Sequence, residues 1–234
     1  MVDFLCIIQA RLDSSRLPAK VMMNLGGETL LKRVYETVSK SRNIDRIVIA
    51  TSDQDGDNII AQHSKKIDVT CFRGNLNNVL KRFYDASKLY NAKNIVRITA
   101  DNPLMDAEVI DSLIAHYKAS GPGVDYSMFK NGVYGLSAEV FSFSALKKAF
   151  NNTDNNFDKE HVTPYIRKNC NVSNINIHSP YNRPDLSATI DTLEDYIRMK
   201  SFYLFCEENN YEQNIDNYIL YLDNAKDFKF AIRY

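Results

Sequence analysis

The chain has 234 residues, of which 44% are apolar and 25% charged, a composition typical of a globular protein with a sizeable core. Its 29 lysine and arginine residues are balanced by 29 aspartate and glutamate residues. The chain therefore lacks the surplus of cations with which a non-specific nucleic-acid binder displaces counterions. These numbers exclude disordered and fibrous classes and argue against nucleic acid as a partner.

The N-terminal sequence and the cysteines indicate a cytoplasmic protein. The N-terminus lacks the basic and long apolar segments of a signal peptide. No apolar run reaches the roughly 18 residues of a membrane span, so we expect no membrane partner. Cys6, Cys71, Cys170 and Cys206 are scattered without zinc-type spacing, as expected of free thiols in a reducing compartment.

Apolar runs and amphipathic segments alternate through the first 120 residues. The runs typical of buried strands are residues 4–8, 46–51, 68–72 and 94–99. The segments with apolar side chains at helical spacing are residues 30–38, 59–63, 76–83 and 109–117. This alternation predicts a three-layer α/β fold with a mostly parallel sheet, in which ligands bind beyond the carboxyl ends of the strands.

The pattern changes after Gly121. Asn131-Gly132 lies between two apolar segments, residues 124–129 and 133–141, and this arrangement predicts a β-hairpin. We predict one domain over residues 1–234, because no repeat or low-complexity linker divides the chain. Within it we expect a hairpin region at about 121–190 and a helical tail at about 192–234.

The helical tail begins with a predicted N-cap at Thr192 and continues toward Glu207. An aromatic helix is expected from about residue 215. This tail either covers the core or forms the surface of a homodimer, and the sequence leaves both open. Its aromatic residues are Tyr211, Tyr218, Tyr221, Phe228, Phe230 and Tyr234.

A basic segment, IIQARLDSSRLPAK at residues 7–20, follows the first strand. Arginine binds phosphate oxygens through two parallel hydrogen bonds and lysine acts as a mobile point charge, so the segment indicates an anion site. A solvated surface loop is the alternative. The segment has neither a P-loop nor a GxGxxG pattern. Its candidate ligands are Arg11, Arg16 and Lys20, with the hydroxyls of Ser14 and Ser15.

Carboxylates follow two further predicted strands. Asp101 lies in TADNPLMD after the strand at 94–99, and Asp191 lies in ATIDTLEDY at the end of a predicted short strand. Mg²⁺ takes one or two carboxylates and completes its shell with phosphate oxygens and water, so these residues are candidate metal ligands. Asp106 is better explained as the cap of the next helix, and Asp191 is equally compatible with a helix start.

Six stretches in this order resemble the cytidylyltransferase family, in the branch of the spore coat polysaccharide biosynthesis protein F. More distant relatives are the synthetases of CMP-Kdo and CMP-sialic acid. The resemblance covers roughly residues 4–200. The stretches are IIQARLDSSRLPAK, FRGNLNNVLKRF, VRITADNPLMD, GLSAEVFSFSAL, KEHVTPYI and SATIDTLEDY.

The resemblance implies a Rossmann-like nucleotide-diphospho-sugar transferase fold, CTP as donor and Mg²⁺ as cofactor. It also implies that the single domain over residues 1–234 is a nucleotidyltransferase domain whose hairpin region at about 121–190 faces the acceptor. It implies that the basic loop wraps the triphosphate and that Asp101 and Asp191 hold the metal. The expected nucleotide-binding residues are Gln9, Ala10, Arg11, Ser14, Ser15, Arg16, Lys20, Ser52, Arg73 and Arg82. The expected catalytic residues are Arg11, Lys20, Asp101 and Asp191.

A small-molecule acceptor is expected beside the metal strand. Arg97 is a candidate for holding its carboxylate or phosphate, with a buried ion pair as the alternative, and His161 is equally compatible with a local structural role. The expected acceptor-binding residues are Arg97, Ser137, Glu139, Glu160 and His161. The chain departs from the family pattern at Asp13 and Ala19, where glycines are usual, and at Ser137, where an Asp is usual.

The predicted reaction couples CTP to an acceptor, expected to be an acidic sugar for a surface glycan, with release of pyrophosphate. A sugar phosphate or another phosphorylated metabolite is the alternative acceptor. A metal-dependent glycosyltransferase would carry a DxD pair, which Asp101-Asn-Pro lacks. A non-catalytic nucleotide-binding protein would be expected to lose at least one of the basic or acidic candidates.

Overall fold

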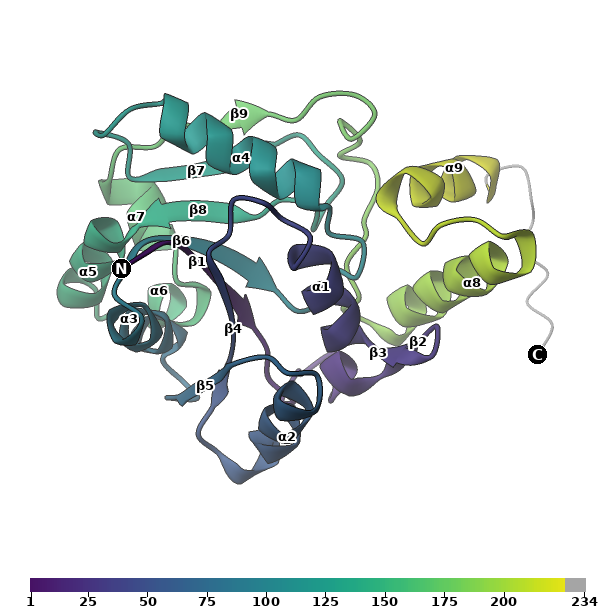
Figure 1. Ribbon diagram of the computed structural model, residues 1–234, viewed down its shortest axis with the longest axis horizontal. Helices are drawn as coiled ribbons and strands as arrows, with labels where there is room; N and C mark the ends of the chain where they lie inside the picture. The colour runs from purple at the N-terminus through teal and green to yellow at the C-terminus, as the bar shows by residue number, and fades with distance from the viewer. Residues whose placement is uncertain (226–234) are drawn as a thin grey trace.

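The computed structural model describes residues 1–225, which form a seven-stranded sheet flanked by helices (Figure 1). The order of the strands is β5-β4-β1-β6-β8-β7-β9. These strands are β1 (Val2–Gln9), β4 (Arg46–Ser52), β5 (Cys71–Gly74), β6 (Ala92–Thr99), β7 (Tyr126–Lys130), β8 (Glu139–Ser142) and β9 (Ile175–Asn176). A separate two-stranded ribbon joins β2 (Asn24–Leu25) and β3 (Glu28–Thr29).

The sheet is mostly parallel, as predicted. β5, β4, β1 and β6 pair in parallel, whereas β8 is antiparallel to both of its neighbours, β6 and β7. β7 and β9 again pair in parallel. The prediction of a Rossmann-like α/β fold is therefore confirmed.

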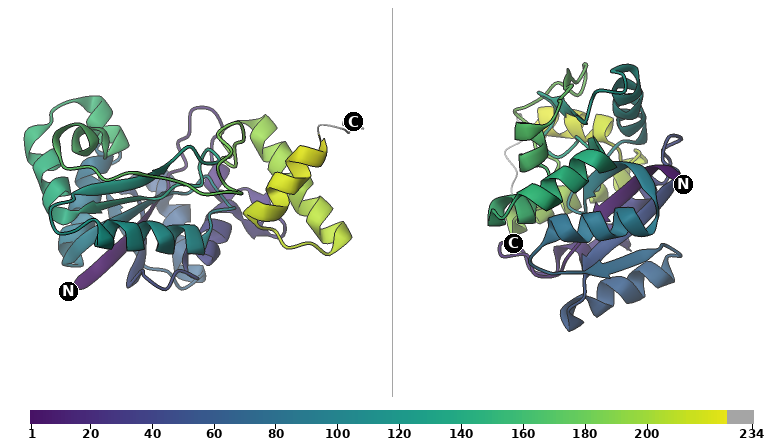
Figure 2. Two further views of the ribbon diagram at one scale, coloured as in Figure 1. Left: turned by 90° about the horizontal axis from the view of Figure 1, so that it is seen from above. Right: turned by 90° about the vertical axis from the view of Figure 1, so that its left-hand side faces the viewer.

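Helices cover both faces of the sheet, and this explains why β1 is apolar from Phe4 to Ile8. Phe4, Cys6 and Ile8 pack in one cluster with α1 and α4, whereas Leu5 and Ile7 pack in the other with α3, α5 and α7. Figure 2 shows these two helical layers on either side of the sheet. The helices are α1 (Leu30–Val38), α2 (Asn58–Lys66), α3 (Val79–Leu89), α4 (Ala107–Ala119), α5 (Phe143–Asn152), α6 (Asn156–His161), α7 (Pro164–Asn169), α8 (Leu193–Asn209) and α9 (Ile215–Ala225).

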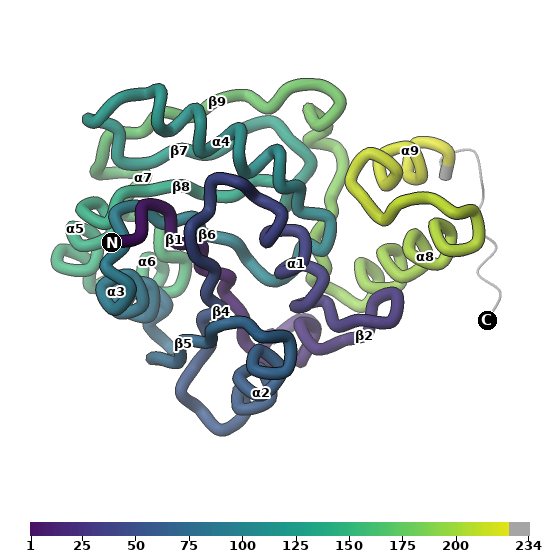
Figure 3. Tube along the Cα trace, in the orientation of Figure 1, coloured from purple at the N-terminus to yellow at the C-terminus, as the bar shows by residue number. Residues whose placement is uncertain are grey.

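The tail helices lie together at the end of the molecule opposite α5 (Figure 3). Thr192 caps α8 as predicted, and its side chain and that of Asp195 form a reciprocal capping box. Phe202 of α8 contacts the rings of Tyr218 and Tyr221 in α9. Among residues 1–225, no helix is long and apolar enough to cross a membrane. Phe228, Phe230 and Tyr234 lie outside the described residues.

Two predicted elements are shifted along the chain. The third strand is Cys71–Gly74 rather than 68–72, because Asp68, at φ 55°, still belongs to the turn that ends α2. The helix predicted at 76–83 begins at Val79, because the Asn78 side chain caps it by accepting a hydrogen bond from Lys81 N. Leu76 therefore lies in the turn that precedes α3.

The hairpin is confirmed as an antiparallel pair, although Asn131-Gly132 does not close it as a two-residue turn. The register pairs Met128 with Glu139, so residues 131–138 form a longer connection. Within it, Tyr134 N donates to Leu186 O and Ala188 N donates to Tyr134 O. Because these hydrogen bonds go to the segment before Asp191, the connection cannot close as a tight turn.

The short strand predicted just before Asp191 is wrong. In place of a strand, the segment makes one isolated bridge, between Ser187 and Tyr134, and continues as an extended chain. Ile190 N donates to Asp101 O at 2.8 Å, so the segment nevertheless brings the backbones before Asp191 and at Asp101 together.

Candidate active site

The basic loop leaves β1 and is anchored to the end of β4. Ala10 N donates to Ala50 O, and Leu12 N donates to the carboxylate of Asp57 at 2.9 Å. Asp57 is buried and also accepts hydrogen bonds from Ser52. Burial raises the pKa of Asp57, but these hydrogen bonds outweigh it, so the pKa lies below its ordinary value. Sequence reasoning missed this anchor, because an Asp in a polar turn gives no signal of its distant partners.

All three cations of the loop are paired with carboxylates. Lys20 Nζ lies 2.8 Å from Asp191 Oδ1 and 3.6 Å from Asp101 Oδ2. Arg16 Nη2 lies 3.0 Å from the same Asp191 oxygen, and Arg11 Nη2 lies 3.3 Å from Glu160 Oε1. The fold thus brings the basic loop against both predicted metal ligands, which come from segments 90 residues apart in the sequence.

These groups surround a cavity of about 300 Å³, which we call the loop cavity. Its lining contains most of the residues expected to bind nucleotide. Asp13, which replaces a usual glycine, is exposed and is not among the lining residues. The residues that line the loop cavity are Gln9, Ala10, Arg11, Ser14, Ser15, Arg16, Lys20, Val21, Arg97, Thr99, Ala100, Asp101, Glu160, His161 and Asp191.

Ala19 occupies the other departure from the family glycines and adopts φ 58°. This left-handed backbone costs little for glycine but is strained for alanine. Ala19 N donates to Leu12 O at 2.8 Å, and Met22 N donates to Ala19 O at 2.9 Å. The two hydrogen bonds hold the turn that delivers Lys20 into the loop cavity.

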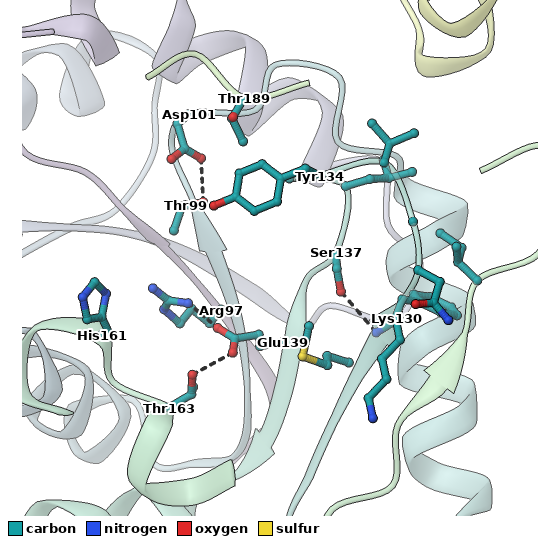
Figure 4. A pocket seen from close by; sticks show the side chains of 18 of the residues that line it. Arg97, Thr99, Asp101, Lys130, Tyr134, Ser137, Glu139, His161, Thr163 and Thr189 are labelled. Atoms are coloured by element: carbon teal, nitrogen blue, oxygen red, sulfur yellow. Dashed lines mark hydrogen bonds and ion pairs between the residues drawn. The ribbon is translucent and has the colours of Figure 1, made fainter. Parts of the chain in front are cut away.

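A second cavity, of about 610 Å³, lies against β6, β8 and β7, and we call it the hairpin cavity (Figure 4). Its floor follows from the strand register, in which Arg97, Glu139 and Met128 form one row across the three strands. The next row on the same face of the sheet, Ile95 with Phe141 and Tyr126, is buried core. The change from apolar to charged residues between the two rows marks where the core ends and the cavity begins.

Arg97 and Glu139 form a buried ion pair on this floor. Glu139 also accepts hydrogen bonds from Tyr126 Oη at 2.6 Å and Thr163 Oγ1 at 2.7 Å. Burial raises the pKa of Glu139, but the charge of Arg97 and these hydrogen bonds outweigh it, so the pKa lies below its ordinary value. Burial and the neighbouring Glu139 raise the pKa of Tyr126. Glu139 is therefore ionised and remains paired with Arg97.

One wall of the hairpin cavity is formed by α6 and α7. Between them, Val162 adopts φ 68° and ψ −53°, and Thr163 N donates to His161 O at 2.8 Å. This three-residue γ-turn is rare and strained, above all for a β-branched residue. Val162 itself is buried in the core. The turn directs Thr163 onto Glu139 and leaves His161 on the cavity wall, beside the ring of Phe157.

The connection between β7 and β8 forms the opposite wall. Gly135 has φ 93°, and a Cβ there would lie 2.4 Å from Thr189, so the segment before Asp191 packs directly on this backbone. Asn102 donates to Gly135 O at 2.7 Å. Ser137 is held by the backbone, since its hydroxyl accepts from Phe129 N and donates to Ala138 O. In Figure 4 the exposed ring of Tyr134 points toward the Thr99–Asp101 pair.

Three predicted nucleotide-binding residues do not line either cavity. Ser52 bonds to Asp57, and Arg73 donates to Ser52 O, Gln54 O and Asn58 Oδ1. Arg82 is fully buried, donates to a backbone oxygen in the turn before α3, and has a pKa lowered by burial to about 10. In this structure these residues support the loops around the loop cavity.

The two cavities meet at four shared lining residues: Arg97, Thr99, Asp101 and His161. Asp101 accepts a hydrogen bond from Thr99 Oγ1 at 2.6 Å, which fixes the orientation of its carboxylate. Asp101 and Asp191 are linked through Lys20 and are 21% and 17% exposed. Two carboxylates that line a cavity together with arginine and lysine side chains fit the preference of Mg²⁺ for one or two protein carboxylates and phosphate oxygens. Residues 1–225 contain no cluster of three His, Cys, Asp or Glu side chains suited to an all-protein metal site.

Known proteins resemble the chain over most of its length. A 36% identical relative is the spore coat polysaccharide biosynthesis protein SpsF of Bacillus subtilis, with 87% of each chain covered. A cytidylyltransferase structure from Leptospira borgpetersenii superposes with a TM-score of 0.87 at 26% identity, covering 100% of both chains. A CMP:2-keto-3-deoxy-manno-octonic acid synthetase complexed with CTP shares the fold at a TM-score of 0.66 and 12% identity, covering 88% of this chain and 99% of its own.

The family profile described as Cytidylyltransferase matches residues 5–229, which include both cavities and every site residue predicted from the sequence. Together with the relative of Bacillus subtilis, this match shows the family. The chain belongs to the cytidylyltransferases.

Proposed function

We propose that the protein transfers the CMP group of CTP to a small anionic acceptor and releases pyrophosphate. The observation that carries this proposal is the junction of two cavities at Asp101, one lined by paired cations and carboxylates and the other open to a second substrate. CTP is supported as donor by the family and by the synthetase whose structure holds CTP.

In the proposed reaction, an acceptor oxygen attacks the α-phosphorus in line and pyrophosphate leaves with the bridging oxygen. Arg11, Arg16 and Lys20 exchange their carboxylate partners for phosphate oxygens and hold the charge of the leaving pyrophosphate. No covalent intermediate is required, so the contribution of the protein is positioning and charge stabilisation.

Asp101 and Asp191 are the residues that would hold Mg²⁺. When bound, the ion would neutralise phosphate charge and polarise the α-phosphoryl group. Thr99 contributes by orienting the Asp101 carboxylate through its hydrogen bond. Lys20 contributes by keeping the two carboxylates close together until the phosphates draw its ammonium group away.

The proposed acceptor is an acidic sugar, and the charges of the hairpin cavity support this assignment. Arg97 is neutralised by Glu139, but Lys130 and Arg167 line the same cavity and make no ion pair within residues 1–225. Apolar side chains of Met128, Val133 and others complete the lining, as expected for binding the carbon skeleton of a sugar. A sugar phosphate would also present negative charge to these cations, so the acceptor panel below includes both classes.

The test is pyrophosphate release from each of the four ribonucleoside triphosphates with Mg²⁺ and a panel of acceptors. The panel contains 3-deoxy-manno-octulosonate, other sugar acids, sugar phosphates and neutral sugars. We expect turnover with CTP and an anionic acceptor, and a preference for CTP over UTP. Uracil lacks the amino group of cytosine, so it would leave a hydrogen-bonding carbonyl of the base site unpaired, which costs about 1–3 kcal/mol. Equal turnover with GTP or UTP would contradict the assignment of CTP.

Replacing Arg16 by alanine should weaken CTP binding more than CMP binding, because the outer phosphates are its proposed partners. A hydrogen bond to a charged group contributes about 1.5–3 kcal/mol, so the Kd for CTP should rise roughly ten- to hundred-fold. Isothermal titration with CTP and CMP measures the difference. An equal loss for both nucleotides would place Arg16 away from the triphosphate.

A further inference from the structure

We propose that Arg97 is a catalytic residue that donates to the α-phosphoryl group during transfer, and that Glu139 positions it. The inference rests on the proposed function and deepens it. The new bond joins an acceptor atom in the hairpin cavity to a phosphorus atom in the loop cavity. The reacting phosphorus must therefore lie where the cavities meet, at Arg97, Thr99, Asp101 and His161.

Arg97 has donors available for this role. Its Nη1 donates to Glu139, and its Nη2 donates to Gln9 Oε1 at 3.3 Å. A guanidinium group carries five N–H donors, so three remain after these two hydrogen bonds. One of them, on Nε, is buried without a partner in the described part of the chain. Because the side chain is 15% exposed and lines both cavities, the two free Nη donors are available at the junction.

The neighbours of Arg97 hold it against the sheet. Glu139 is fixed by Tyr126 and Thr163, and Gln9 approaches from β1, the strand next to β6. A guanidinium held on both sides is preorganised, which is what stabilisation of developing charge requires. Recognition of the acceptor anion is better assigned to Lys130 and Arg167. These residues make no ion pair within residues 1–225, and they line the hairpin cavity but not the loop cavity.

The step balances without a further reagent. The acceptor oxygen forms a bond to the α-phosphorus, and the bond from that phosphorus to the β-bridging oxygen breaks with its electron pair. Where the attacking group is a hydroxyl, its proton passes to the imidazole of His161, whose ring nitrogens make no hydrogen bond within residues 1–225. Arg97 acts on the non-bridging oxygens, where negative charge is concentrated during transfer.

Arg97→Lys is the test variant, since a lysine keeps a positive charge beside Glu139 while losing the forked donors. Steady-state rates are measured with CTP and with both diastereomers of its α-thio analogue, using each panel acceptor that is turned over. We expect kcat to fall about 10²–10³-fold, as for loss of one preorganised donor. The acceptor KM should change less than about two-fold. In the parent chain, sulfur at one of the two non-bridging α-positions should weaken the hydrogen bond from Arg97 and slow the reaction. In Arg97→Lys that hydrogen bond is already lost, so for the same diastereomer the ratio of the CTP rate to the thio rate should fall toward unity.

Arg167→Lys is the matched control, because Arg167 lines the hairpin cavity alone. It should raise the acceptor KM and retain the thio effect of the parent chain. A raised acceptor KM with unchanged kcat in Arg97→Lys would overturn the proposal and make Arg97 an acceptor ligand. A lowered melting temperature with an unchanged thio ratio would overturn it in favour of a structural role. If the parent chain released no pyrophosphate with any acceptor, the proposed function itself would fall, and this assignment with it.

Discussion

Replacing Asp101 or Asp191 by asparagine should reduce turnover by at least about 10²–10³-fold while leaving the protein folded. Each change removes a charged oxygen ligand from the proposed metal, whose charge stabilisation amounts to several kcal/mol. Both side chains are partly exposed, so the change leaves no charge stranded in the core. Pyrophosphate release over a Mg²⁺ titration measures the effect, and we expect the Mg²⁺ requirement to rise in parallel.

Asp13→Asn is the control for both variants. Asp13 lies in the same basic loop and carries the same charge, but it is exposed and lines neither cavity. We expect it to retain the turnover of the parent chain. Full activity of Asp101→Asn at saturating Mg²⁺ would remove Asp101 from the metal site, and the same result for Asp191→Asn would remove Asp191.

Replacing Glu139 by glutamine should lower the free energy of unfolding by about 3 kcal/mol, because the charge of Arg97 is then left without its buried partner. Breaking a buried ion pair by removing one side typically costs about 3–5 kcal/mol, and the retained oxygen still accepts from Tyr126 and Thr163. For a chain of this length the melting temperature should fall by about 6–12 °C. Urea unfolding followed by circular dichroism measures the difference.

The pH dependence gives a second readout of the same residue. The pKa of Glu139 in the folded protein lies below its ordinary value of 4.5, so its ionisation stabilises the fold fully above that value. That contribution is lost as the pH falls through the folded pKa. The parent chain should therefore lose more stability than Glu139→Gln on acidification below about pH 4.5. Parallel acid unfolding curves would show that Glu139 is not ionised in the fold.

Adding Arg97→Met to Glu139→Gln should restore part of the lost stability, since the uncompensated charge is removed.

The central strands could be predicted because β1 and β4 contain continuous apolar runs that are buried on both faces and β6 contains the buried apolar residues Ile95, Val96 and Ile98. β1, β4 and β6 lie within two residues of the predicted limits, whereas β5 is displaced because Ile67 and Asp68 form the turn after α2 and the strand begins only at Cys71. The long connection of the hairpin could not be predicted, for a different reason. Asn131-Gly132 has the local chemistry of a tight turn, but the hydrogen bonds of Tyr134 with Leu186 and Ala188, 52 and 54 positions away, decide the backbone path.

In the candidate site too, some residues could be predicted from the sequence and others could not. The basic loop and Asp101 are visible in the sequence because both follow apolar strands directly. The pairing of Arg97 with Glu139 depends on β8 inserting antiparallel beside β6, and no local pattern specifies a contact across 42 residues. Asp57 and the strained turn at Val162 are likewise hidden, because their roles come from groups that only the folded chain brings near.

Three cations of the basic loop, Arg11, Arg16 and Lys20, face three carboxylates, those of Glu160, Asp191 and Asp101, so the charges of these six groups nearly cancel. A lone anion such as inorganic phosphate would attract the cations but strand the carboxylates, and a lone divalent cation would do the reverse. The proposed substrate, a nucleotide chelated to a divalent ion, would satisfy both sets in one event. From this charge balance we expect the loop cavity to bind inorganic phosphate alone or a divalent cation alone less tightly than it binds the chelated nucleotide.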